Sequence, residues 1–240
     1  MKPGRLLASG RDGDIFEYGP NLVLRKTRDG RSIAHEARIM EYVAEHGYPV
    51  PAIEEVRADG TEIVMERVDG PQMLDTGAAA LVRLPRMLRT LADLHDQLHE
   101  IPAPPWLERA LGKGDRLLHL DLHPLNVLMS PTRGPVVIDW PNASRGDPQL
   151  DVAMTYALLT CPRIPVPRLL EVALDAIRVG ATNRFFARRY RGPSFADAVA
   201  FAAELKALDV NMAPDEVARL LRLAQHPRGR RGWSPLHRAR

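Results

Sequence analysis

The 240-residue sequence predicts an α+β protein with a small, antiparallel β-rich N-terminal lobe and a larger, mainly helical C-terminal lobe. Two observations support this prediction. As far as residue 68, short apolar runs between Gly-containing turns indicate strands, with one helix among them. Beyond Asp69-Gly70, apolar residues recur at helical spacing over most of the chain. We expect lobes at residues 1–68 and 69–225, followed by a basic tail at residues 226–240.

The N-terminal third contains the expected strands. A hairpin is predicted at residues 6–19, and a third strand follows at residues 21–26. Residues 32–46 have the apolar spacing of a helix, which Gly47 ends. Residues 49–68 then indicate two strands joined by Ala58-Asp59-Gly60. Because the turns between strands are short, we expect the sheet to be antiparallel.

The C-terminal part is mostly helical. A leucine stripe predicts a long helix at residues 78–99, with a kink or break at Pro85. Two short, mostly apolar strands are expected at residues 117–129 and 135–140. From residue 150 to 225 the pattern is helical, with breaks at Pro162–Pro167 and at Gly192-Pro193.

The composition is that of a globular protein with no evident polyanionic partner. Hydrophobic residues make up 45% of the chain, and 33 basic and 30 acidic residues give a net charge of +3. Nucleic acid is therefore not an expected partner, and we expect the basic tail to be solvated. Cys161 is the single cysteine, which is typical of a reducing compartment. With no signal peptide and no apolar run of about 20 residues, we expect a cytoplasmic protein without a membrane partner.

The stretch LLHLDLHPLNVLMS places polar residues among apolar neighbours. On a strand, His119, Asp121 and His123 would project to one side, as in a metal cluster. That interpretation needs further ligands, and the helical pair His95 and His99 is the nearest candidate. A polar helix face is the more common explanation of such a pair, so we disfavour a metal hydrolase.

The spacing of three residues meets the needs of phosphoryl transfer. Asp121 and Asn126 lie in one loop, and Asp139 follows the apolar run VVI. One carboxylate can orient an attacking hydroxyl and accept its proton, while a second carboxylate and an amide oxygen hold magnesium. These three residue types in this order therefore favour a phosphotransferase.

The same residues carry a family resemblance. HLDLHPLN at 119–126 resembles the loop H-x-D-x-x-x-x-N, Ile138-Asp139-Trp140 stands where kinases have D-F-G, and GDPQLDVA follows at 146–153. Together they are similar to the aminoglycoside phosphotransferase family, which has a protein-kinase-like fold. The resemblance implies Mg²⁺-dependent transfer of the γ-phosphate of ATP, or of another nucleoside triphosphate, to a small-molecule hydroxyl. It makes Asp121 catalytic, and Asn126 and Asp139 the metal ligands.

The resemblance also assigns nucleotide binding to the N-terminal lobe. In that assignment the turn at Gly10, Arg11, Asp12 and Gly13 covers the phosphates. A cation on the following strand contacts the α- and β-phosphates. Alternation allows only one of Arg25 and Lys26 to enter the cleft. The family pattern favours Arg25, with Glu36 as its partner.

Further roles follow from the resemblance. Backbone groups from Glu66 to Val68 are expected to meet the adenine edge. His95 and His119 are expected to be structural, and the role of His123 stays open. Either Asp147 or Asp151 is expected to brace the catalytic loop, and Trp140 to pack rather than to stack on a ligand.

One departure bears on the acceptor. Residues 183–192 (NRFFARRYRG) are strongly basic, whereas a pocket for polycationic aminoglycosides should be acidic. We therefore expect a different acceptor. The alternative function is a catalytically weak or inactive kinase-like scaffold that binds nucleotide. A protein kinase is disfavoured because no long activation segment separates IDW from GDPQLD, and the oligomeric state stays open.

Overall fold

The computed structural model describes residues 2–10, 13–74, 80–161, 167–190, 193–209 and 212–225. It divides into two compact units. Unit 1 comprises Met1–Met73 and Leu125–Ala143, and unit 2 comprises Leu74–Pro124 and Ser144–Arg240. The sequence predicts one boundary near residue 68, so the segment 125–143 belongs to a different part in the structure. The predicted basic tail at 226–240 lies outside the described residues.

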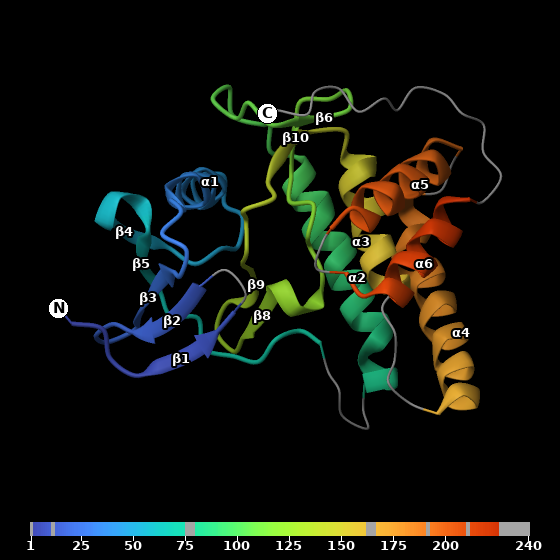
Figure 1. Cartoon of the computed structure of the whole chain (residues 1–240), viewed down its shortest axis with the longest axis horizontal. Helices are drawn as coiled ribbons and strands as arrows, with labels where there is room; N and C mark the ends of the chain where they lie inside the picture. The colour runs from blue at the N-terminus through green and yellow to red at the C-terminus, as the bar shows by residue number, and fades with distance from the viewer. Residues whose placement is uncertain are drawn as a thin grey trace. The chain divides into compact units, whose positions relative to one another are not determined.

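Unit 1 is built on a five-stranded antiparallel sheet in the order β1-β2-β3-β5-β4 (Figure 1). Its strands are β1 (Leu6–Ser9), β2 (Gly13–Glu17), β3 (Leu22–Thr27), β4 (Ile53–Arg57) and β5 (Glu62–Glu66). A 3₁₀ turn at Ala58–Gly60 joins the last two strands. The five predicted strands and their antiparallel pairing are therefore confirmed.

One helix covers this sheet. Helix α1 (Ala34–Glu45) buries Ala37 and Met40, and Ala37 packs with Ile63 of β5. Gly47 follows with a φ of 78°, a left-handed conformation that suits a glycine after a helix end. The predicted helix at residues 32–46 is confirmed.

A hairpin from later in the chain completes unit 1. It consists of β8 (Val127–Ser130) and β9 (Gly134–Val137). Three backbone hydrogen bonds attach it: Met73 N–H to Val127 O (2.7 Å), Met129 N–H to Pro71 O (2.8 Å) and Val137 N–H to Pro49 O (2.7 Å). At Gly70 a Cβ would overlap the carbonyl oxygen of Met129, so this attachment requires a glycine. These contacts account for the assignment of 125–143 to unit 1.

Unit 2 is mainly helical. Its helices are α2 (Ala80–His99), α3 (Pro148–Thr160), α4 (Arg168–Phe185), α5 (Pro193–Ala207) and α6 (Pro214–Ala224), with a 3₁₀ turn at Ala187–Tyr190 (Figure 1). Helix α2 continues through Pro85, so of the predicted kink or break at this residue the break is wrong. Pro85 removes one intrahelical hydrogen bond and crowds the carbonyl of the preceding turn, yet the helix continues on both sides of it. The interruption between α5 and α6 was not predicted. No described helix is both long and apolar enough to cross a membrane.

A small sheet in the order β6-β10-β7 accompanies these helices. Its strands are β6 (Ala110–Leu111), β7 (Arg116–Leu118) and β10 (Ser144–Gly146). The strand predicted at residues 117–129 is wrong in its middle. It ends at Leu118, residues 119–123 form a loop, and a 3₁₀ turn at Pro124–Asn126 precedes β8. Alternation therefore does not order the side chains of this loop.

Candidate active site

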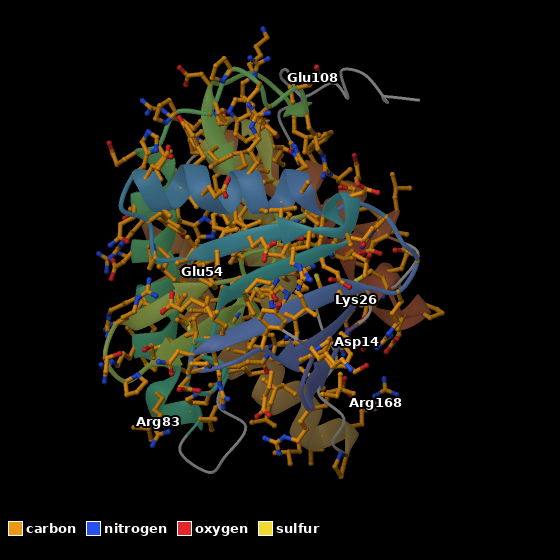
Figure 2. All side chains as sticks on the ribbon, turned by 90° about the vertical axis from the view of Figure 1, so that its left-hand side faces the viewer. Asp14, Lys26, Glu54, Arg83, Glu108 and Arg168 are labelled. Carbon is orange, nitrogen blue, oxygen red and sulfur yellow. The ribbon has the colours of Figure 1, made fainter. Side chains whose placement is uncertain are left out.

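A cation and two carboxylates meet in unit 1. Arg25 on β3 forms an ion pair with Glu36 of α1, and its second terminal nitrogen lies 3.7 Å from a carboxylate oxygen of Asp139. Lys26 projects from the opposite, exposed face of β3, and its Nζ lies 2.9 Å from Glu62 (Figure 2). Of the two cations that the sequence leaves open, Arg25 is the one beside Asp139.

Glu36 is a buried carboxylate. Its Oε1 accepts the backbone N–H of Trp140 at 3.2 Å, while Oε2 has no hydrogen-bond partner among the described residues. Burial raises the pKa of Glu36, and this effect outweighs the opposing charge of Arg25. Trp140 is also buried, and its ring meets that of Tyr48 edge-on. The predicted packing role of Trp140 is confirmed.

The base of the β8–β9 hairpin brings the two predicted metal ligands to adjacent positions. Val127 pairs with Val137, and Ile138 N–H donates to Asn126 O at 3.0 Å. Asn126 is buried, whereas the side chain of Asp139 is partly exposed. Magnesium prefers hard oxygen ligands and retains several waters, so one amide oxygen and one carboxylate suit it. The donor set fits Mg²⁺.

Asp139 also has an unusual backbone. Its φ is 69°, in the left-handed region that few residues other than glycine adopt. Such conformations cost free energy and often occur at functional sites. In this chain it turns the backbone between β9 and the buried Trp140.

The glycine turn between β1 and β2 is tightly built. Gly10 N–H donates to Gly13 O at 2.9 Å. A Cβ at Gly13 would overlap the carbonyl oxygen of Lys26 on the neighbouring strand, so only glycine fits there. Arg11 and Asp12, which the sequence assigns to the same phosphate-covering turn, lie outside the described residues.

The predicted adenine-binding segment follows β5. The side chain of Glu66 forms an ion pair with Arg133 of the hairpin, so its carboxylate is engaged within unit 1. Arg67 N–H still donates to Asn21 O at 2.8 Å. Val68 has no backbone–backbone hydrogen bond within the described part of the chain.

In unit 2, one buried carboxylate holds the loop that the sequence predicts to be catalytic. Asp151 of α3 accepts the backbone N–H of Leu120 at 2.6 Å and that of His119 at 3.2 Å. Leu120 has a φ of 64°, so the brace holds a strained residue. Asp147 instead caps α3 by accepting a backbone N–H of its first turn at 2.9 Å. The prediction that one of these aspartates braces the loop is confirmed for Asp151.

Two histidines extend this brace. His99 Nε2 lies 3.0 Å from Asp151, and His95 Nε2 lies 2.9 Å from Thr155 Oγ1, whose hydroxyl donates to Leu122 O at 2.7 Å. The predicted structural role of His95 is confirmed. Possible ligand atoms of His95, His99 and Asp151 all lie within 4.8 Å of one another. Because both oxygens of Asp151 accept backbone N–H groups, we interpret the cluster as a hydrogen-bonded brace.

Asp121 follows the braced residues and has basic neighbours. Its backbone N–H donates to His119 Nδ1 at 3.2 Å. Its carboxylate lies 3.7 Å from His123 Nε2 and 3.4 Å from Lys206 Nζ. Burial alone would raise the pKa of Asp121. The contact with His123 and the charge of Lys206 outweigh burial and lower that pKa well below its usual range. The carboxylate is therefore ionised at neutral pH.

Lys206 is the residue of this group that the sequence did not reveal. It lies near the end of α5, and its Nζ is also 3.0 Å from Asp209. Burial would lower the pKa of Lys206, but the charges of Asp121 and Asp209 raise it. In the sequence, Lys206 and Asp209 have the spacing of an ordinary ion pair on a helix surface. No motif there signals a contact with Asp121.

Two residues of the basic stretch at 183–192 contact helix α2. Arg189 pairs with Asp93 at 2.7 Å and Asp96 at 2.8 Å, both on α2. The hydroxyl of Tyr190 donates to Asp96 at 2.7 Å. These contacts join the 3₁₀ turn to α2, so this stretch alone does not indicate what acceptor binds.

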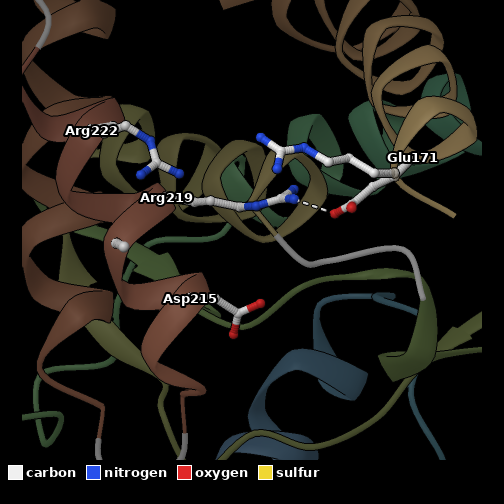
Figure 3. A pocket seen from close by; sticks show the side chains of 6 residues that line it. Glu171, Asp215, Arg219 and Arg222 are labelled. Carbon is white, nitrogen blue, oxygen red and sulfur yellow. Dashed lines mark hydrogen bonds and ion pairs between the residues drawn. The ribbon is translucent and has the colours of Figure 1, made fainter. Parts of the chain in front are cut away.

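Helices α4 and α6 line a separate pocket (Figure 3). Its lining residues are Arg168, Glu171, Asp215, Ala218, Arg219 and Arg222. Arg219 donates to Glu171 at 2.5 Å and to Asp175 at 2.8 Å. None of the sequence motifs at 119–126, 138–140 and 146–153 contributes a lining residue to this pocket. Its Arg219 pairs with carboxylates of α4.

Comparison with protein families gives one match. Residues 4–116 and 105–177 match the model of the phosphotransferase enzyme family, also called APH. Comparison with curated protein sequences gives no match.

Solved structures with the same fold include several kinases. A thermostable mutant of aminoglycoside phosphotransferase APH(4)-Ia, in complex with ADP and hygromycin B, is 17% identical with a TM-score of 0.62, covering 92% of this chain and 91% of that one. A choline/ethanolamine kinase family protein from Mesorhizobium loti is 16% identical with a TM-score of 0.56, covering 94% and 89%. An amicoumacin kinase in complex with AMP-PNP, Ca²⁺ and its ligand is 16% identical with a TM-score of 0.54, covering 92% and 86%. The predicted α+β, two-lobed, kinase-like fold is confirmed.

Proposed function

The chain belongs to the phosphotransferase enzyme family, and we propose that it transfers the γ-phosphate of ATP to a hydroxyl group of a small molecule. The observation that carries this proposal is the group formed by Arg25, Glu36 and Asp139, with Asn126 at the same hairpin base. A paired cation and hard oxygen donors are the groups that a nucleotide triphosphate with Mg²⁺ requires.

Residues of unit 1 bind the nucleotide in this proposal. Arg25, oriented by Glu36, contacts the α- and β-phosphates, and the turn at residues 10–13 covers them. Main-chain groups between Glu66 and Val68 meet the base. Because these base contacts use the main chain, they leave the choice between ATP and GTP open. Asn126 and Asp139 hold Mg²⁺, which neutralises charge on the phosphate oxygens when it is bound.

Asp121 is the proposed catalytic residue. It accepts a hydrogen bond from the acceptor hydroxyl and so orients its oxygen toward the γ-phosphorus. As the new O–P bond forms, the bond from the γ-phosphorus to the β-phosphate oxygen breaks, ADP leaves, and the hydroxyl proton passes to Asp121. The lowered pKa of Asp121 makes it a weak base, so we assign it mainly to orientation, with proton transfer late in the reaction.

The alternative is a catalytically weak or inactive scaffold that binds nucleotide. Such a protein needs no ionised carboxylate at Asp121. The braced loop and the basic neighbours of Asp121 favour the active enzyme, because they maintain that carboxylate at a cost in backbone strain.

The test compares Asp121→Asn with the parent chain. We expect ATP consumption with a panel of hydroxyl compounds to fall about 10²–10⁴-fold in the variant, because asparagine has no ionised carboxylate to orient the hydroxyl and take up its proton. Mg-ATP should still raise the melting temperature of both proteins. Asp115→Asn, at an exposed position, is the matched control. Equal rates of phosphate transfer in D121N and the parent would contradict the role of Asp121. Loss of the Mg-ATP shift in D121N would point to a folding defect.

A further inference from the structure

A lysine of α5 lies between two carboxylates beside the proposed catalytic residue. Lys206 Nζ is 3.4 Å from Asp121 Oδ1 and 3.0 Å from Asp209 Oδ2, and only 15% of the Lys206 side chain is exposed. Both distances lie within unit 2. An ammonium group is thus already present next to the oxygen to which the acceptor hydroxyl would bind.

Without this lysine, the two carboxylates would attract cations. Two negative charges in a partly buried place bind an ammonium group strongly, because solvent screens them less than at an open surface. Lys206 supplies that positive charge from the protein itself. Its position is therefore the one that an ammonium group of an acceptor would otherwise take.

The contact with Lys206 does not use all the hydrogen-bonding capacity of the Asp121 carboxylate. The hydrogen bond from Lys206 Nζ to Asp121 Oδ1 is 3.4 Å long, whereas charged N–H···O bonds are typically about 2.7–2.9 Å, so it is a weak one. An ionised carboxylate offers about four lone-pair sites, so Asp121 can accept from Lys206 and from an acceptor at once. The lysine can thus stay in place during the reaction.

We infer that Lys206 is a specificity-determining residue that excludes acceptors carrying an ammonium group beside the reacting hydroxyl, and so selects uncharged hydroxyl compounds. This inference rests on the proposed function and names its acceptor class. It concerns the charge next to the hydroxyl only. His123 lies near the other oxygen of this carboxylate, with its Nε2 3.7 Å from Asp121 Oδ2.

The experiment uses two probes that differ in one group, glycerol and 3-amino-1,2-propanediol. ATP consumption is measured with each probe in the parent chain, Lys206→Met and Lys206→Arg, with Mg-ATP present. The parent and Lys206→Arg should prefer glycerol. In Lys206→Met the rate with the amine, relative to glycerol, should rise about tenfold or more, because the positive charge of Lys206 no longer offsets the two carboxylates. The double variant Lys206→Met with Asp209→Asn should lose much of that rise.

The outcomes separate this inference from the proposed function. A ratio of the two rates that is unchanged in Lys206→Met, including no response to either probe, overturns the role of Lys206. A parent chain that prefers the amine overturns it as well. If the parent neither consumes ATP nor is stabilised by Mg-ATP, the proposed function itself fails. ATP consumption that depends on Asp121, with an unchanged probe ratio, contradicts only the inference about Lys206.

Discussion

Glu36 shows how a single buried carboxylate can connect α1, β3 and the segment after β9. It accepts the backbone N–H of Trp140 and pairs with Arg25. Breaking a buried pair by removing one partner is usually far more costly than forming it is favourable. We therefore interpret the Arg25–Glu36 pair as a means of orienting Arg25 rather than as a source of folding stability.

The pH dependence of stability tests the burial of Glu36. Its pKa in the folded protein is raised, so the folded state binds more protons than the unfolded state between the two pKa values. The contribution of Glu36 to the free energy of unfolding is thus largest below about pH 4 and is lost as pH rises through the raised pKa. Glu36→Gln cannot titrate, so the parent should lose stability relative to this variant as pH increases.

Urea unfolding between pH 4 and 8 measures the difference in free energy of unfolding between the parent and Glu36→Gln. Glu54→Gln, an exposed position on β4 (Figure 2), is the control and should change the free energy of unfolding by less than about 0.5 kcal/mol at any pH. A difference for Glu36→Gln that is constant or grows in favour of the parent with pH would contradict the raised pKa.

At the level of elements, α3 holds the loop that precedes Asp121. Asp151 is fully buried, and its two oxygens accept backbone N–H groups of successive loop residues. Its pKa lies well below the usual range. Burial opposes this shift, but the contacts with His95 and His99 outweigh it. The loop conformation therefore depends on one carboxylate of a neighbouring helix.

The substitution Asp151→Asn should destabilise the protein by about 3 kcal/mol, because an amide NH₂ replaces one of the accepting oxygens and leaves a buried N–H unpaired. Asp147→Asn makes the same chemical change at the start of the same helix. It should change stability by less than about 0.5 kcal/mol, since asparagine caps a helix as well as aspartate does. Thermal and urea unfolding measure both effects, and equal losses in the two variants would argue against the brace.

The same loop shows what a sequence can and cannot predict. The spacing of Asp121, Asn126 and Asp139 was enough to indicate phosphoryl transfer, because motif chemistry depends on residue order. The strand predicted across 117–129 was wrong, because an apolar run does not reveal a left-handed residue such as Leu120. Lys206 was missed because its contact with Asp121 joins residues far apart in the chain, at a position that resembles a helix surface.

For the whole molecule, the division into units determines which segments should respond together to nucleotide. The hairpin at 125–143 belongs to unit 1 through backbone hydrogen bonds to residues 49, 71 and 73. It carries Asn126 and Asp139, so the proposed metal ligands and Arg25 are in one compact unit. We therefore expect nucleotide binding to stabilise the hairpin together with the N-terminal sheet.

Hydrogen exchange tests this expectation. Mg-ATP at 100 times its dissociation constant should stabilise a binding unit by about 2.7 kcal/mol, and protection should rise for amides of β2, β3 and the hairpin alike, including Val127 and Val137. Chelating Mg²⁺ with EDTA should remove most of this protection. Asp139→Asn should remove it too, whereas Asp115→Asn, whose side chain is 86% exposed, should retain it. Protection confined to β2 and β3, with the hairpin unchanged, would contradict the assignment of Asn126 and Asp139 to the nucleotide-bound metal.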